Sequence, residues 1–392
     1  MPEETVYSTP HNLFSVPDIH PEANRDAISG HGNVQVFLYP FHSPFEAHEL
    51  IAVAHDLVNP RGKGVYATDE SPDAMDDLLD SVLPEGGKKR LTGTEKTERR
   101  KKWKEDMYNA VPSEYISGVI LHEETLLDFK LAPLLSSKGI IPGVRANKEL
   151  TPIPRSEEEY IVQGIDDMLP RLQAARAAGA RFSKFRTPIS CSSEKTGFPS
   201  PLSLEIQAET LAQFAAISQQ AGLVPIVEPD VDFSKDADLA RSADIHERAI
   251  SLIYERMRAH GVLLEGSLIK PSFPQPGLQH PSKARVTPEQ IAVATATVIS
   301  RTVPSAVPGV LFLSGGMSSD TATKYLAALN ALVLKSEPSS PFSRLPALTF
   351  SYGRALQGEP MKHWGKGDEA AAREALKKWS KAFWHAARGE VL

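Results

Sequence analysis

The stretch LVPIVEPD, residues 223–230, is an apolar run rich in branched side chains that ends abruptly in Glu228 and Asp230. Such a run is typical of a buried strand, and its polar end marks where the strand stops. Similar short apolar runs occur at residues 65–67, 118–121, 140–144, 182–185, 263–269, 310–313 and 348–350. Segments with apolar residues at helical spacing separate them, among them residues 45–57, 161–178, 204–221, 238–260 and 288–302. Eight buried strands that alternate with amphipathic helices predict an α/β fold, a (β/α)8 TIM barrel in a single domain.

The barrel pattern occupies residues 46–360, which sets the expected boundaries. Residues 1–45 are rich in His, Pro and Asn without periodicity and predict an N-terminal extension. Residues 361–392 predict a C-terminal helical tail. The highly charged segment 85–105 predicts a solvated helix and loop after the first strand rather than a binding patch.

The composition argues against several classes of function. With 43 Lys+Arg against 49 Asp+Glu, the net charge of -6 gives no electrostatic reason to expect a nucleic acid or a membrane as a partner. The single cysteine, Cys191, excludes an intrachain disulfide. No apolar stretch reaches the roughly 18 residues of a membrane span, and the N-terminus lacks the basic start of a secretory signal. We therefore expect a cytoplasmic protein.

Polar side chains follow every predicted strand at the point where it ends. In a (β/α)8 barrel the carboxyl ends of all strands meet at one mouth, so these side chains should share one cavity. A single strand-end lysine or carboxylate has an ordinary structural explanation, but the same feature at every strand end favours a functional site. In chain order the candidates are Asp69, His122-Glu123-Glu124, Arg145 with Lys148, Lys184 with Arg186, Glu228 with Asp230, Lys270, Ser314-Gly315-Gly316 and Ser351-Tyr352-Gly353-Arg354.

This set suggests carbonyl chemistry centred on Lys270, which follows the apolar run 263–269 and precedes a proline. Burial and a cationic neighbour such as Lys184 both favour a neutral amine, which can attack a ketone. Glu228 would move protons while the carbinolamine forms and hydrolyses. Asp69 is the candidate base for the reacting hydroxyl.

Two glycine-containing turns follow the last two predicted strands, at Ser314-Gly315-Gly316 and at Gly353-Arg354. In (β/α)8 barrels the loops after strands seven and eight frequently bind phosphate through backbone N–H groups, and an arginine fork matches phosphate oxygens. The sequence therefore predicts a phosphorylated ketone as the substrate.

Six motifs recur here in a fixed order and spacing. LEGSLIKP, residues 264–271, is similar to LEGTLLKP, and LTFSYGRALQ, residues 348–357, matches a known motif letter for letter. The others are KGVYATDES (63–71), GVILHEETL (118–126), VPIVEPD (224–230) and FLSGGMS (312–318). Together they resemble the motifs of class I (Schiff-base) fructose-bisphosphate aldolases, from about Glu49 to about Gln357, and the chain resembles a divergent member of that family.

The resemblance implies an aldehyde-lyase that catalyses reversible aldol cleavage and condensation of a ketose phosphate. Fructose 1,6-bisphosphate or fructose 1-phosphate would give dihydroxyacetone phosphate plus an aldehyde, through a lysine imine. The family needs no metal or other cofactor for this reaction. Its members act in glycolysis and are usually homotetramers, so the resemblance also implies a homo-oligomer.

The resemblance assigns roles to the strand-end residues. Lys270 would form the imine, and Glu228 would shuttle the protons of imine formation. Asp69 would accept the proton in carbon–carbon cleavage, and Lys184 would stabilise charge at the reacting centre. The implied substrate-binding residues are Arg145, Arg186, Asp230, Ser314, Gly315, Ser351, Gly353 and Arg354. The phosphate of the dihydroxyacetone portion would be held by Ser314, Gly315, Gly353 and Arg354.

The chain also departs from the family in positions that tune or recognise the substrate. Arg145 and Asn147 stand where the family has a lysine and a carboxylate, and Asp230 stands where it has a glutamate. The family's C-terminal tyrosine, which assists proton exchange at the imine, has no counterpart in residues 388–392. These differences predict slow protonation of the enamine.

A further departure follows the catalytic aspartate. Residues 71–74, Ser-Pro-Asp-Ala, replace the family's Ser-Thr-Gly-Ser, whose serine helps to hold the second phosphate. The carboxylates of Asp73, Asp76 and Asp77 should repel that phosphate. The sequence therefore predicts an altered recognition site for the aldehyde.

Two other functions stay open. The same imine would also serve a specialised biosynthetic carbon–carbon lyase with a different acceptor, because fold and chemistry do not fix the substrate. A non-catalytic scaffold would have lost catalytic residues, whereas those named above are all present. A metal-dependent aldolase would need a His, Glu or Asp ligand set, and the histidines show no paired spacing at strand ends.

Overall fold

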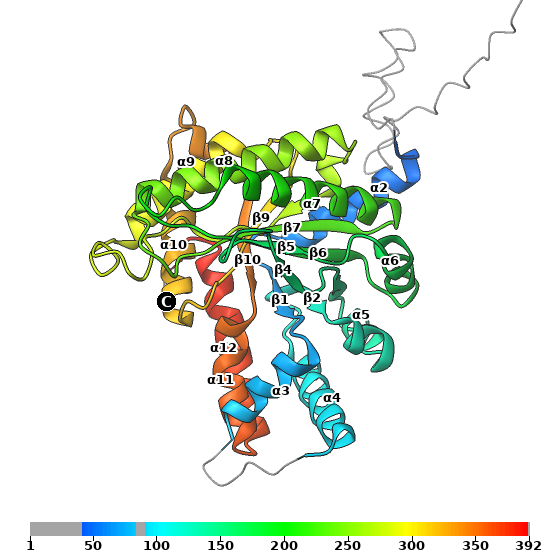
Figure 1. Ribbon diagram of the computed structural model, residues 1–392. Helices are drawn as coiled ribbons and strands as arrows, with labels where there is room; N and C mark the ends of the chain where they lie inside the picture. The colour runs from blue at the N-terminus through cyan, green and yellow to red at the C-terminus, as the bar shows by residue number, and fades with distance from the viewer. Residues whose placement is uncertain (1–40, 84–90, 391–392) are drawn as a thin grey trace, which may run out of the picture.

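Eight parallel strands close into a barrel, as the sequence predicts (Figure 1). The structure is a computed structural model that describes residues 41–83 and 91–390. Most of the expected N-terminal extension and the start of the charged segment 85–105 lie outside the described residues. The order around the barrel is β1-β10-β9-β8-β7-β6-β3-β2. The strands are β1 (Gly64–Thr68), β2 (Ile116–Leu121), β3 (Ile141–Arg145), β6 (Phe182–Ile189), β7 (Val224–Val231), β8 (Leu268–Ile269), β9 (Gly309–Phe312) and β10 (Ala347–Tyr352).

Helices between successive strands cover the outside of the barrel, because each buries one apolar face on the sheet. Their bounds are α5 (Ala132–Ser136), α6 (Met168–Ala177), α7 (Pro201–Gln220), α8 (Leu239–Ala259), α9 (Pro288–Thr302) and α10 (Ser319–Lys335). Among the residues that the structure describes, no helix combines the length and apolar character needed to cross a membrane.

Helix α2 (Pro44–Val58) packs across the end of the barrel where the strands begin. A Cβ atom on Gly309, the first residue of β9, would lie 2.6 Å from a methyl carbon of Val58. A Cβ atom on Gly118 in β2 would lie 2.7 Å from Leu57. Glycine at these two positions therefore allows the helix to approach the strands closely. The carboxyl ends of the strands lie at the opposite end of the barrel.

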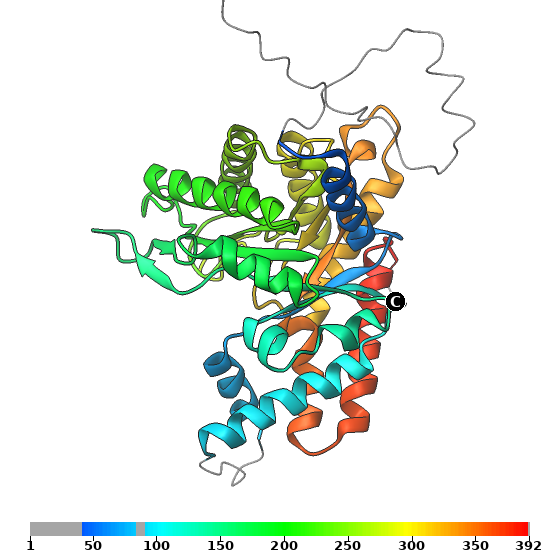
Figure 2. The ribbon, with the colours of Figure 1, turned by 90° about the vertical axis from the view of Figure 1, so that its right-hand side faces the viewer.

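Four further helices gather on one side of the barrel (Figures 1 and 2). They are α3 (Pro72–Ser81), α4 (Gly93–Ala110), α11 (Arg354–Gly365) and α12 (Glu369–Ala386). Phe383 of α12 packs on the last strand, with ring centroids 5.5 Å from Phe350 and 4.8 Å from Tyr352. The expected boundary between the barrel (to residue 360) and the helical tail (from residue 361) falls inside α11.

Two segments differ from the sequence prediction. The helix expected over residues 161–178 begins only at Met168, because Gly164 has a φ angle of 115° that a helix cannot contain. The residues before it form a hairpin of β4 (Leu150–Pro152) and β5 (Tyr160–Val162). The strand expected over residues 263–269 shrinks to β8. The backbone at the start of the expected strand bonds instead to the side chain of Gln219, which donates to Leu263 O at 2.8 Å.

Candidate active site

Alternating charges from four strands form a continuous buried chain at the mouth of the barrel. Lys270 Nζ, after β8, lies 3.1 Å from Glu228 Oε1 on β7. The other oxygen of Glu228 lies 3.1 Å from Lys184 Nζ on β6. Lys184 Nζ in turn lies 2.7 Å from Oδ2 of Asp69, the residue that follows β1. The structure thus brings together the four predicted catalytic side chains, in the order Lys270–Glu228–Lys184–Asp69.

The two lysines determine the charge state of the two carboxyl groups. Burial alone would raise the pKa of Asp69, but the charges of Lys184 and Lys270 outweigh burial and hold that pKa well below its ordinary value. The pKa of Glu228 is lowered by the same balance of burial against the two lysines. Burial would lower the pKa of Lys184, but Asp69 and Glu228 raise it. At neutral pH both carboxylates are therefore ionised and can accept a proton.

The residues predicted to bind the substrate on β3, β6 and β7 lie beside this chain of charges. Arg145 Nη1 donates to the backbone oxygen of Asp69 at 3.3 Å, and its Nε donates to Asn147 O at 3.0 Å. Arg186 Nε donates to Asp230 Oδ2 at 2.7 Å. Arg186 N donates to the side chain of Asn147 at 3.2 Å. The amide of Asn147 thus links the segment after β3 to β6.

The two glycine turns lie side by side and can accept an anion. Gly315 and Gly316 have φ angles of 55° and 88°, which a residue with a Cβ atom rarely adopts. A Cβ atom on Gly316 would lie 3.2 Å from Nη2 of Arg354, so the turn and the guanidinium group are neighbours. Helix α11 begins at Arg354 with Gly353 as its N-cap, and no side chain caps it. An uncapped helix start beside an arginine suits a phosphate group.

A cavity of about 490 Å³ lies beside this turn and is lined in part by Gly315, Arg354, Arg186 and Asp230. Ser314 is buried at the end of β9. The hydroxyl of Ser351, on β10, is buried and has no hydrogen-bond partner among the described residues. The predicted substrate-binding residues therefore come together around the cavity and the barrel mouth.

Other strand-end residues form structural contacts instead. Lys148 Nζ lies 2.5 Å from Asp167 on the surface, and Glu123 lies 2.6 Å from Arg171. His122 Nδ1 accepts a hydrogen bond from Glu124 N at 3.2 Å. Within residues 41–83 and 91–390, no group of three or more His, Cys, Asp or Glu side chains is arranged to hold a metal ion.

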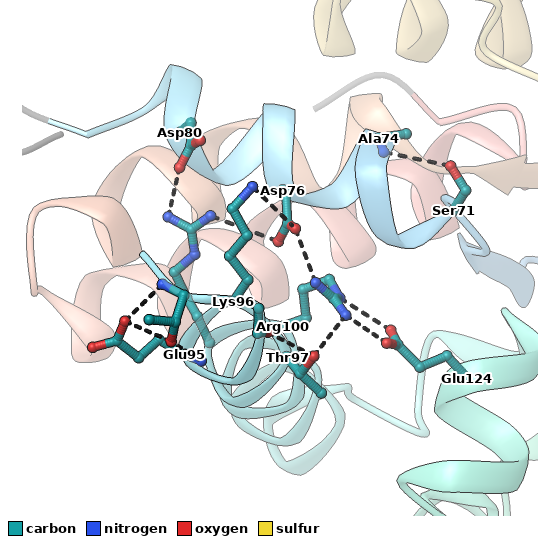
Figure 3. Close-up of polar contacts among 12 residues, drawn as sticks. Ser71, Ala74, Asp76, Asp80, Glu95, Lys96, Thr97, Arg100 and Glu124 are labelled. Atoms are coloured by element: carbon teal, nitrogen blue, oxygen red, sulfur yellow. Dashed lines mark hydrogen bonds and ion pairs between the residues drawn. The ribbon is translucent and has the colours of Figure 1, made fainter. Parts of the chain in front are cut away.

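One sequence expectation about the second phosphate needs correction. Asp76 does not face the site as a free charge, because it is buried between α3 and α4 (Figure 3). Its Oδ2 accepts from Arg100 Nη1 at 2.9 Å, and Arg100 also contacts Glu124 at 2.5 Å. Of the three carboxylates, only those of Asp73 and Asp77 remain exposed.

Sequence reasoning missed a second layer of polar residues behind Asp69. Lys104 of α4 donates to the backbone oxygen of Thr68 at 2.6 Å. Glu70 accepts a hydrogen bond from Gln357 of α11. The only sequence signal for this layer is the spacing of Arg100, Lys104 and Tyr108, which places three polar side chains on one face of α4.

Fold and site together define a (β/α)8-barrel lyase that makes and breaks carbon–carbon bonds. The family described as "Glycolytic: Fructose-bisphosphate aldolase class-I" matches residues 49–391, and the chain belongs to this family. Fructose-bisphosphate aldolase of Drosophila melanogaster is 38% identical over 354 residues, which cover 88% of this chain and 91% of the relative. Fructose-bisphosphate aldolase B of Homo sapiens is 35% identical over 363 residues, covering 90% and 93%.

A solved structure supports the same relationship. Fructose-bisphosphate aldolase from Plasmodium falciparum, in a ternary co-crystal with TRAP and a small-molecule inhibitor, matches with a TM-score of 0.80. It is 35% identical and covers 89% of this chain and 96% of that chain. The predicted fold class and the predicted aldehyde-lyase activity are thereby confirmed.

Proposed function

We propose that this aldolase cleaves and forms a ketose phosphate through an imine on Lys270. The observation that carries the proposal is the position of Glu228 between two lysines, 3.1 Å from each ammonium group. One carboxylate can therefore exchange protons with the lysine that attacks the ketone while the other lysine keeps it ionised. The membership of the chain in the class I family supports the same mechanism.

The proposed reaction uses the charged side chains in the order Lys270, Glu228 and Asp69. The Lys270 amine adds to the ketone carbonyl, Glu228 relays protons, and water leaves to give the imine. Asp69 then accepts the proton of the hydroxyl on the β carbon, two carbons away from the imine carbon. As that hydroxyl becomes a carbonyl, the bond between the α and β carbons breaks and its electron pair moves into the imine, giving an enamine and releasing the aldehyde. Protonation and hydrolysis of the enamine release dihydroxyacetone phosphate and free Lys270.

The phosphate of the donor half would lie against the turn of Ser314 and Gly315 and the start of α11, with Arg354 as its cation. The pair of Arg186 and Asp230 lines the same cavity and would orient the sugar hydroxyls. Ser351 offers a buried hydroxyl with no partner among the described residues. The substrates we propose first are fructose 1,6-bisphosphate, after which the relatives are named, and fructose 1-phosphate.

Trapping the imine tests the mechanism. The protein is incubated with dihydroxyacetone phosphate and reduced with borohydride, and its intact mass and peptide map are measured. We expect one ligand-dependent adduct on the peptide that carries Lys270. The Lys270→Met variant should show none, while Lys148→Met, which removes a surface lysine, should react like the original protein. Absence of an adduct with this and other ketones would refute the imine mechanism.

A specialised lyase with a different acceptor is the second candidate, and the first turn of α3 favours it. Ser71 already caps its own helix by accepting from Ala74 N at 3.4 Å (Figure 3). Asp73 is exposed in the same turn, with no cation paired to it in the described part of the chain. A second phosphate near this turn would meet a negative charge.

Comparing two substrates tests this altered recognition. We expect fructose 1-phosphate to be cleaved at least as efficiently as fructose 1,6-bisphosphate. Asp73→Asn should raise kcat/KM for the bisphosphate alone. The control variant Asp56→Asn, on α2 at the far end of the barrel, should leave kcat/KM unchanged for both substrates. A strong preference of the unmodified protein for the bisphosphate would contradict this second candidate.

We also propose a homotetramer in the cytoplasm with a role in glycolysis and no cofactor beyond the lysine itself, on the strength of the family alone. Light scattering coupled to size-exclusion chromatography measures the assembly. A monomeric mass at micromolar concentration would contradict the tetramer.

A further inference from the structure

Helix α4 carries an unusual face for a strongly charged surface helix. Arg100, Lys104 and Tyr108 follow one another at intervals of four residues, so they lie along one side of the helix. All three are buried. Burial of an ammonium group is costly unless oxygen atoms surround it, so the contacts of Lys104 indicate what this face does.

Those contacts hold the residue that comes directly before Asp69. Lys104 Nζ donates to the backbone oxygen of Thr68 at 2.6 Å. The hydroxyl of Thr68 donates to Ile120 O at 2.8 Å and lies 2.6 Å from the hydroxyl of Tyr108. Since Thr68 has only one hydroxyl hydrogen, Tyr108 is the donor to it. Helix α4 therefore fixes both the backbone and the side chain of Thr68.

The residue after Asp69 is held by the same lysine and by α11. Glu70 Oε2 lies 3.5 Å from Lys104 Nζ. The other oxygen of Glu70 accepts a hydrogen bond from Gln357, whose side-chain oxygen accepts from Tyr66 OH at 3.2 Å. The segment is thus fixed on both sides of the catalytic aspartate.

Arg100 extends this hold to the next helix. Figure 3 shows its guanidinium between Asp76 of α3 and Glu124 in the segment that follows β2. Helix α4 therefore contacts the chain at Thr68 and again at Asp76, at both ends of the stretch that contains Asp69.

We infer that Lys104 is a positioning residue for Asp69: by holding the carbonyl of Thr68 and the carboxylate of Glu70, it keeps the Asp69 carboxylate where it removes the proton that starts carbon–carbon cleavage. The inference rests on the proposed function of Asp69. It predicts a separation of two steps. Imine formation depends on Lys270 and Glu228, which Lys104 does not touch, whereas cleavage depends on the position of Asp69.

Replacing Lys104 with methionine, of similar length, tests the separation. For Lys104→Met we expect the kcat of cleavage to fall about tenfold to a hundredfold, as a small misplacement of a catalytic group does. The rate of borohydride trapping with dihydroxyacetone phosphate and the KM should stay within about twofold of the original values, since the imine-forming residues are untouched. Tyr108→Phe keeps the ring and should lower kcat in the same direction by less. Lys102→Met removes an exposed lysine of the same helix and should change nothing.

The outcomes separate this inference from the proposed function. An unchanged kcat in Lys104→Met, or an equal loss of trapping and cleavage in a folded variant, would overturn the positioning role. Thermal unfolding by circular dichroism establishes that each variant is folded, and Tyr108→Phe decides the question if Lys104→Met does not fold. Failure of the unmodified protein to trap any ketone would instead count against the imine mechanism.

Discussion

Lys184 Nζ lies 2.7 Å from Asp69 Oδ2, an ion pair that joins β6 to the loop after β1. The pair is almost fully removed from solvent, with side-chain exposures of 5% and 13%. In such surroundings neither charge would be stable alone. Lys184, together with Lys270, therefore keeps Asp69 ionised in a site that burial would otherwise neutralise.

Removing this lysine should change how activity depends on pH. In Lys184→Met the pKa of Asp69 and of Glu228 should rise, because burial favours the neutral acid and Lys184 no longer opposes it. A base with a raised pKa loses its proton only at higher pH, so the acidic limb of the kcat/KM profile should move upward. We also expect activity at pH 7 to fall about a hundredfold or more. A profile that keeps its acidic limb in Lys184→Met would contradict this account.

A methyl group on Gly316 should weaken phosphate binding specifically. The new Cβ would lie 3.2 Å from Arg354 Nη2, and a φ angle of 88° is strained for alanine. In Gly316→Ala we expect the KM for a ketose 1-phosphate to rise about tenfold, equivalent to roughly 1.4 kcal/mol of binding. Steady-state kinetics measures this. The control is Gly358→Ala, because a Cβ atom at Gly358 on α11 would meet no described atom within 4 Å outside its own helix backbone and chain neighbours.

The buried His246 should destabilise the fold at mildly acidic pH. Its Nε2 lies 2.9 Å from the hydroxyl of Ser272, two residues beyond Lys270. Burial lowers the pKa of His246 from 6.5 to about 4. The folded protein then binds a proton less readily than the unfolded chain. The contribution of neutral His246 to the free energy of unfolding is therefore complete above pH 6.5 and is lost as pH falls toward 4. The loss amounts to about 3 kcal/mol.

Urea unfolding at several pH values between 4.5 and 7 checks the prediction for His246. The His246→Gln variant should show a weaker dependence of unfolding free energy on pH over this range. An identical dependence in both proteins would assign the acid sensitivity to other groups.

Breaking the ionic cluster between α3 and α4 should destabilise the protein strongly. Arg100 contacts Asp76 and Glu124, and the side chains of Arg100 and Asp76 are 8% and 7% exposed. Arg100→Met would leave Glu124 without its arginine and Asp76 with only the more distant Arg99, at 3.7 Å, and Lys96. We expect a cost of about 3 kcal/mol in unfolding free energy. Lys96 belongs to the same cluster, 3.9 Å from Asp76, but is more exposed than Arg100. Lys96→Met should therefore lower the unfolding free energy much less. Similar losses in both variants would show that the burial of Arg100 is unimportant.

Much of the fold and the charged core of the site could be predicted because one physical rule links them. Parallel strands in a barrel place their carboxyl ends together, so Asp69, Lys184, Glu228 and Lys270 were expected to meet although they are far apart in sequence. The strand patterns around them are apolar enough to recognise individually. The roles assigned to these residues stay predictions until the variants are measured.

The second layer behind Asp69 could not be predicted, because its signal is indistinguishable from that of a surface helix. A lysine such as Lys104, among many charged neighbours, normally faces water. Its burial depends on the position of Thr68 and Glu70, which only the closed barrel determines. The burial of Asp76 could not be predicted either, since it is decided by Arg100 and not by its own helix. The short β8 likewise depends on Gln219, a residue on another element.

The barrel closes by pairing β1 with β10, so Val65 lies beside Ser351 and Tyr66 beside Tyr352. The hydrogen bond from Tyr66 to Gln357 spans 291 residues of chain. During synthesis on the ribosome, Asp69 and Lys270 are translated well before the strand that completes the ring around them. Loop closure over such a separation is slow, and the partly made sheet has open edges until then. The reacting lysine and its carboxylates therefore acquire their working arrangement near the end of translation, and a fragment that stops before β10 would carry those residues without an active site.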